Sequence, residues 1–132
     1  MTRMLRGLLP GTGRVRVVVR DGVIAEVEVE ESRPDWDDRA RSEPLLLPGL
    51  VDLQVNGYAG VDFTDPSLDV DGVRTVVEAM QRTGVTGFCP TIITGPLDDC
   101  LASLRALREA TRDPDLDDAV LGVHLEGPWI SD

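Results

Sequence analysis

Three apolar stretches alternate with two amphipathic stretches in residues 45–125, and this order limits the folds open to the chain. The apolar stretches are residues 45–55, 85–94 and 119–125. Nearly continuous apolar runs of this length are typical of strands covered on both faces, as in parallel sheets. The stretches between them have the apolar spacing of helices. The order therefore predicts two successive βαβ units.

The two helices are predicted by apolar side chains that recur at intervals of three and four residues. The first begins at about Val70 after a capping Ser67 or Asp69, and Gly84 supplies its stop. The second opens at Pro96, with acidic residues in its first turn and arginines toward its end, an order that complements the helix dipole. The apolar stripes are Val73, Val76, Val77 and Met80 in the first helix and Leu97, Leu101, Leu104 and Leu107 in the second.

A different pattern precedes the βαβ region. Residues 14–30 alternate between apolar and charged side chains on both sides of the dipeptide Asp21-Gly22, which is typical of an antiparallel hairpin. Residues 31–44 are polar and acidic, and we interpret them as a loop that joins two architectures. The sequence thus predicts a β-hairpin or β-sandwich segment at residues 1–47 and an α/β region at residues 48–132.

Composition excludes several classes of function. The chain has 24 acidic and 13 basic residues, a net charge of −11, so it offers no attraction to nucleic acid or to an anionic membrane. Its basic residues are all arginine, which excludes a lysine nucleophile in this segment. Its first ten residues lack the sustained apolar stretch of a signal peptide, and no later run approaches the length needed to cross a bilayer. Two cysteines, Cys89 and Cys100, are too few for a disulfide framework, and we expect a cytoplasmic protein.

Polar residues at the ends of the predicted strands are the candidate functional residues. Two folds continue a pair of βαβ units, a doubly wound sheet and an eight-stranded barrel. The first strand is not followed by the Gly-x-Gly-x-x-Gly loop of a Rossmann fold, so the barrel is favoured. Barrel enzymes carry their functional groups at the C-terminal ends of the strands. Here those ends carry Gln54, Asn56, Thr91, Thr94 and Glu126.

Three blocks of sequence surround these strand ends. They read Pro-Gly-Leu-Val-Asp-Leu-Gln-Val-Asn-Gly at residues 48–57, Gly-Val-Thr-Gly-Phe-Cys-Pro-Thr-Ile-Ile-Thr at residues 84–94 and Gly-Val-His-Leu-Glu-Gly-Pro-Trp at residues 122–129. In this order and spacing they resemble the N-acetylglucosamine-6-phosphate deacetylases of the amidohydrolase superfamily. The resemblance implies an α/β fold, the N-terminal part of a (β/α)8 amidohydrolase barrel preceded by a small antiparallel β-sandwich segment.

The resemblance also implies roles for individual residues. Glu126 is expected to bind one divalent metal ion, Zn²⁺ or similar, which polarises the amide carbonyl of the substrate. Many amidohydrolases have His-x-His at the end of the first strand, where this chain has Gln54 and Asn56. Neutral amides are poor zinc ligands, so we expect these two to position water or substrate, or equally to form a hydrogen-bonded barrel rim. His124 faces the same side of its strand as Glu126 and is expected to be a barrel-interior histidine satisfied by its neighbours, with water or substrate positioning as the alternative.

The reaction implied by the resemblance is hydrolysis of N-acetylglucosamine 6-phosphate to glucosamine 6-phosphate and acetate, a step of amino-sugar catabolism. In that family the remaining metal ligands and the general base come from later strands, so no catalytic residue is expected before Asp132. A complete barrel needs roughly 250 residues. We therefore expect the N-terminal part of a longer, homo-oligomeric enzyme, inactive and poorly soluble alone. The alternatives are another amide-cleaving amidohydrolase and a non-catalytic half-barrel interaction module.

Overall fold

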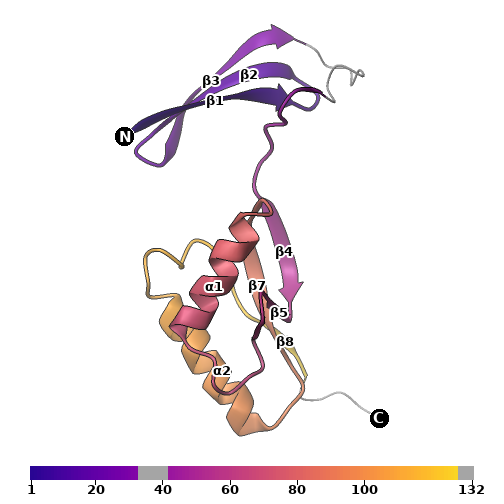
Figure 1. Ribbon diagram of the computed structural model, residues 1–132, viewed down its shortest axis with the longest axis vertical. Coiled ribbons are helices and arrows are strands. Elements are labelled where there is room, and N and C mark those ends of the chain that lie inside the picture. The colour runs from indigo at the N-terminus through magenta and orange to yellow at the C-terminus, as the bar shows by residue number, and fades with distance from the viewer. Residues whose placement is uncertain (33–41, 128–132) are drawn as a thin grey trace. The chain divides into compact units, whose positions relative to one another are not determined.

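The computed structural model describes residues 1–32 and 42–127, and the chain divides into two compact units (Figure 1). The first unit is Met1–Pro48 and the second is Gly49–Asp132. Most of the predicted acidic loop lies outside the described residues, as do the last residues of the third sequence block. Neither helix in the described part of the chain is long and apolar enough to span a membrane.

The first unit is built on an antiparallel sheet whose described strands have the order β1-β2-β3. The strands are β1 (Thr2–Leu9), β2 (Gly13–Arg20) and β3 (Val23–Ser32). The predicted hairpin is present, because β2 and β3 are joined by Asp21 and Gly22, with φ of 50° and 83°. Positive φ at both positions is what a two-residue hairpin turn requires. The sequence did not predict β1, because its apolar and polar residues alternate too weakly.

The two faces of this sheet differ in chemistry because side chains alternate along each strand. One face carries ion pairs between strands, in which Arg16 meets Glu26 and Glu28, and Arg6 meets Glu30 at 3.0 Å. The other face is an apolar hollow. It is lined by Leu5, Leu9, Val15, Val17, Val19, Ile24, Val27, Leu46, Leu47 and Pro48.

The second unit has the predicted order of strand, helix, strand, helix and strand. Its elements are β4 (Leu50–Val55), α1 (Val70–Gln81), β7 (Val85–Ile93), α2 (Leu97–Ala110) and β8 (His124–Glu126). Within the described residues the three strands form a parallel sheet in the order β4-β7-β8. Figure 1 shows α1 and α2 next to each other beside this sheet.

Two predicted strands are shorter in the structure. The run at residues 119–125 yields only β8, because Leu116, Ala119 and Val120 enter the core from a series of turns and Val120 makes only an isolated bridge to Phe88. The run at residues 45–55 yields only β4, because Pro48 and Gly49 interrupt it. The expectation that this strand is covered on both faces is wrong for the described residues, since most of its apolar side chains are exposed.

The helix boundaries follow local chemistry. Asp69 rather than Ser67 caps α1, and its carboxylate accepts a hydrogen bond of 2.8 Å from the backbone N–H of Gly72. Gly84 lies beyond the helix end and takes a φ of +90°, a conformation that favours glycine. Helix α2 begins at Leu97, one residue after the predicted start, and Pro96 is its N-cap residue.

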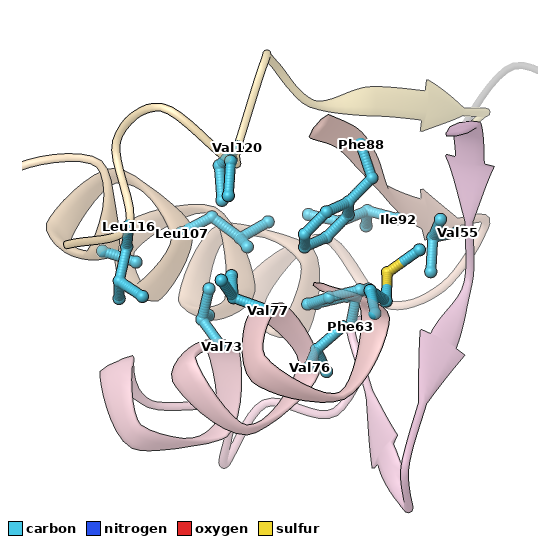
Figure 2. Packing of buried hydrophobic residues seen from close by; sticks show 13 residues of the cluster. Val55, Phe63, Val73, Val76, Val77, Phe88, Ile92, Leu107, Leu116 and Val120 are labelled. Atoms are coloured by element: carbon cyan, nitrogen blue, oxygen red, sulfur yellow. The ribbon is translucent and has the colours of Figure 1, made fainter. Parts of the chain in front are cut away.

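The core of the second unit lies between the helices and one face of the sheet (Figure 2). Phe63 and Phe88 are fully buried and stack with ring centroids 5.9 Å apart. The buried cluster also contains Val55, Val73, Val76, Val77, Met80, Ile92, Leu107, Ala110, Leu116, Ala119 and Val120. Both predicted helix stripes reach this core, the second mainly through Leu107.

The connection from β4 to α1 carries a small hairpin of β5 (Gly57–Tyr58) and β6 (Val61–Asp62). Gly57 is required there because a Cβ atom would lie 2.2 Å from the carbonyl oxygen of Val61. After the hairpin, Phe63 anchors the loop in the core. Hydrogen bonds from the hydroxyl and the backbone N–H of Ser67 lower the pKa of Asp65 below its ordinary value.

Candidate functional site

The carboxyl ends of β4, β7 and β8 meet at one edge of the sheet, because the three strands are parallel. Gln54 is the penultimate residue of β4, and Glu126 is the last residue of β8. Thr94 directly follows β7. The fold therefore gathers three polar side chains, far apart in the sequence, at this edge.

The side chains of Gln54, His124 and Glu126 lie on the face of the sheet opposite the helices. Val55 belongs to the core that contacts the helices, and Val123 packs against that core. Side chains alternate along a strand, so Gln54 beside Val55 points to the other face. His124 and Glu126 do the same on β8, since they flank the position of Leu125.

Gln54 and Glu126 contact each other across the middle strand. The Nε2 atom of Gln54 donates a hydrogen bond of 3.3 Å to Oε2 of Glu126. Strands β4 and β8 are not neighbours, because β7 lies between them. On β7 the residue paired with His124 is Thr91, which is fully buried. The residue paired with Glu126 is Ile93.

His124 contacts the main chain of the same distant strand. Its ring atom Nδ1 lies 3.3 Å from the carbonyl oxygen of Leu53. A carbonyl oxygen can only accept, so Nδ1 is the protonated nitrogen in this contact. In the neutral ring, Nε2 then remains an acceptor. The His124 residue is exposed.

The carboxylate of Glu126 is free to meet a cation. It is partly buried, and none of the ion pairs in the described ranges involves it. Its one side-chain partner there is the neutral amide of Gln54. The described residues contain no group of three or more His, Cys, Asp or Glu side chains suited to a metal ion. Glu126 thus offers one oxygen ligand, fewer than the three protein ligands of a typical catalytic zinc site.

Thr94 holds the main chain at Glu126, a contact that the sequence did not reveal. Its Oγ1 donates a hydrogen bond of 2.9 Å to the carbonyl oxygen of Glu126. Gly127 follows with a φ of +114°, and a Cβ atom there would lie 2.0 Å from the same Oγ1. Two features of the sequence could have indicated this contact: Thr94 stands at a predicted strand end, and a glycine directly follows Glu126.

The other strand-end and thiol residues lie apart from this contact. Asn56 is exposed, and its main-chain carbonyl accepts a hydrogen bond of 3.0 Å from the N–H of Phe63. No hydrogen bond joins its side chain to Glu126 in the described part of the chain. Cys100 approaches the carbonyl oxygen of Ile93 at 3.8 Å, and Cys89 is a partly buried free thiol.

The known proteins that this chain resembles share one name. No family model matches the chain. The chain is 42% identical to N-acetylglucosamine-6-phosphate deacetylase of Bos taurus over 117 residues, which cover 86% of this chain and 28% of the relative. It is 40% identical to the enzyme of the same name from Mus musculus over 134 residues, covering 98% of this chain and 32% of the relative. The Bacillus subtilis enzyme of that name is 30% identical over 120 residues, covering 87% and 30%.

The resemblance to the N-acetylglucosamine-6-phosphate deacetylases is confirmed. Among solved structures, the deacetylase from Thermotoga maritima has a TM-score of 0.75 at 27% identity, covering 98% of this chain and 33% of that one. The deacetylase from Pasteurella multocida has a TM-score of 0.76 at 23% identity, covering 99% and 35%, which supports the fold alone. The chain spans about a third of the length of the deacetylases that it matches.

Proposed function

We propose that this chain is the N-terminal part of a metal-dependent deacetylase that hydrolyses N-acetylglucosamine 6-phosphate to glucosamine 6-phosphate and acetate. The supporting observation is the carboxylate of Glu126 at the carboxyl edge of a parallel sheet, in a sequence 42% identical to the deacetylase of that name from Bos taurus over 117 residues. Functional groups of barrel enzymes lie at that edge.

The same proposal extends to the architecture. Residues 48–132 would supply the first three strands and two helices of a (β/α)8 barrel, and residues 1–47 the β-sandwich segment before it. The parallel order β4-β7-β8, with helices on one face, supports the barrel part. The antiparallel sheet of the first unit supports the second assignment. The completed enzyme is proposed to be a cytoplasmic homo-oligomer.

In the proposed site, Glu126 holds one divalent ion, Zn²⁺ or similar, together with ligands from elsewhere. Such an ion supplies, when bound, polarisation of the amide carbonyl. Gln54 orients the carboxylate of Glu126 through its amide and keeps a carbonyl oxygen for water or substrate. Asn56 and His124 are assigned to water or substrate positioning. The segment supplies no general base in this proposal.

The test is Glu126→Gln in the chain completed with the unmatched two thirds of the Bacillus subtilis relative. Glutamine keeps the shape of the side chain but removes the charged ligand. We therefore expect loss of bound metal, measured by elemental analysis, and a fall of at least about 100-fold in the rate of deacetylation. Glu109→Gln is the matched control, since Glu109 is exposed on α2 and pairs with Arg112 at 2.7 Å. An unsubstituted completed chain that folds without deacetylating, or a fully active Glu126→Gln variant, overturns the proposal.

A further inference from the structure

We infer that Thr94 is a positioning residue for Glu126, acting through the main chain rather than through the carboxylate. This inference rests on the proposed function, in which Glu126 holds the metal ion. Thr94 lies one residue beyond the last ladder pair, Ile93 with Glu126. The backbone pairing of β7 and β8 ends there, and the hydroxyl of Thr94 makes the next contact between them at 2.9 Å.

The close packing at Gly127 supports this role. Gly127 adopts a φ of +114°, which disfavours any residue with a side chain. Its missing Cβ atom also leaves the space that Oγ1 of Thr94 occupies, because a Cβ would lie 2.0 Å from that oxygen. The hydroxyl therefore fits between the end of β7 and the main chain of Gly127, directly after β8.

Gln54 contacts the side chain of the same residue. Its amide reaches Oε2 of Glu126 at 3.3 Å from β4, while Thr94 holds the carbonyl oxygen from β7. A residue of β4 and the residue that follows β7 thus restrain the carboxylate and the main chain of Glu126, respectively. Groups that orient a metal ligand in this way change metal affinity or activity by about 10- to 100-fold when they are removed.

The decisive substitution is Thr94→Val in the completed chain, because valine keeps the shape and removes only the hydroxyl. We expect the dissociation constant for Zn²⁺, measured by competition with a chromophoric chelator, to rise about 10- to 100-fold. We expect kcat to fall with KM nearly unchanged, since Thr94 acts on the metal ligand and not on the substrate. Thr94→Ser should restore both quantities to within a few-fold, because the oxygen is retained.

Thr111→Val is the matched control. The hydroxyl of Thr111 is also exposed and donates a hydrogen bond of the same 2.9 Å to a main-chain carbonyl, that of Arg108. It lies at the end of α2, which is the opposite end of the unit from the carboxyl edge of the strands. We expect it to leave zinc affinity unchanged. Both variants should keep similar unfolding midpoints if the effect of Thr94 is positional.

The outcomes separate this inference from the proposed function. If Glu126→Gln loses metal and activity while Thr94→Val matches Thr111→Val in zinc affinity, the metal site stands and the role of Thr94 is wrong. If Thr94→Ser fails to rescue a weakened Thr94→Val, the hydroxyl is not the operative group and the inference is also wrong. If Glu126→Gln retains both metal and activity, the proposed function itself fails.

Discussion

The two units bury their apolar side chains to very different extents. In the second unit, two helices cover one face of a parallel sheet and enclose a core with fully buried Phe63 and Phe88. In the first unit, the described strands form one sheet whose apolar face is only partly covered, with Val17 7% but Ile24 64% and Val27 55% exposed. A single sheet has no second layer to cover it, and stable domains need two. The comparison indicates that the second unit carries most of the stability of the described residues and also holds the candidate site.

The sharpest test of this difference is Phe88→Ala. Phe88 is 1% exposed and stacks on Phe63, so its removal leaves a cavity between the sheet and the helices. We expect a loss of about 3–5 kcal/mol in the free energy of unfolding of the second unit. Residue-resolved hydrogen exchange measures each unit separately. Leu5→Ala in the first unit, where the side chain is 44% exposed, should cost much less, and equal losses would refute the comparison.

The sequence predicted the second unit better than the first for a physical reason. Apolar stripes such as Val73, Val76 and Val77 form the buried face of one helix, so their spacing along the sequence is enough to predict that helix. Strand β1 is recognisable only through its pairing with β2, and no local pattern records that pairing. Similarly, residues 119–125 are apolar like a strand, yet the first residues of this run reach the core from turns and not from a strand.

The sequence also predicted some features of the candidate site and not others. The position of Glu126 at a strand end follows from the order of apolar stretches and from the resemblance to a family. The contact of Thr94 with the carbonyl of Glu126 depends on the register of two strands, which the sequence does not specify. The contact of Gln54 with Glu126 depends in turn on the order of the strands, which places β7 between β4 and β8. These contacts between strands therefore could not be predicted without the structure.

The two units should also differ in how their stability depends on pH, by an effect smaller than that of Phe88→Ala. The pKa of Asp113, in the second unit, is lowered from 3.8 by a hydrogen bond from the backbone N–H of Asp115 and by contact with Arg74. A lowered folded-state pKa gives stability that is present above the unfolded value and is lost as pH falls through the folded value. In the first unit, Glu43 and Glu28 raise the pKa values of Arg14 and Arg16, so those shifts act only in strong alkali.

We therefore expect Asp113→Asn to flatten the acid limb of unfolding of the second unit below about pH 4. Asparagine keeps the oxygen that accepts from Asp115, so the turn is preserved while the charge is removed. The effect should be modest, because the side chain is largely accessible to solvent. The measurement is the denaturation midpoint of each unit between pH 2 and 7. An unchanged acid limb in this variant would show that Asp113 does not couple folding to pH.

The smallest effect on stability is expected on the open face of the first unit, where one substitution can be made at two paired positions. Val17 and Val27 are cross-strand neighbours, but Val17 is 7% exposed and Val27 is 55% exposed. Val17→Thr places a hydroxyl in a buried position and should cost about 1–3 kcal/mol. Val27→Thr should change the free energy of unfolding by less than about 0.5 kcal/mol, because threonine suits a strand and this position meets solvent. It should also reduce self-association, measured by sedimentation, since it shortens an exposed apolar patch. A large loss of stability in Val27→Thr would mean that this face is covered in solution, and the contrast between the two units would then disappear.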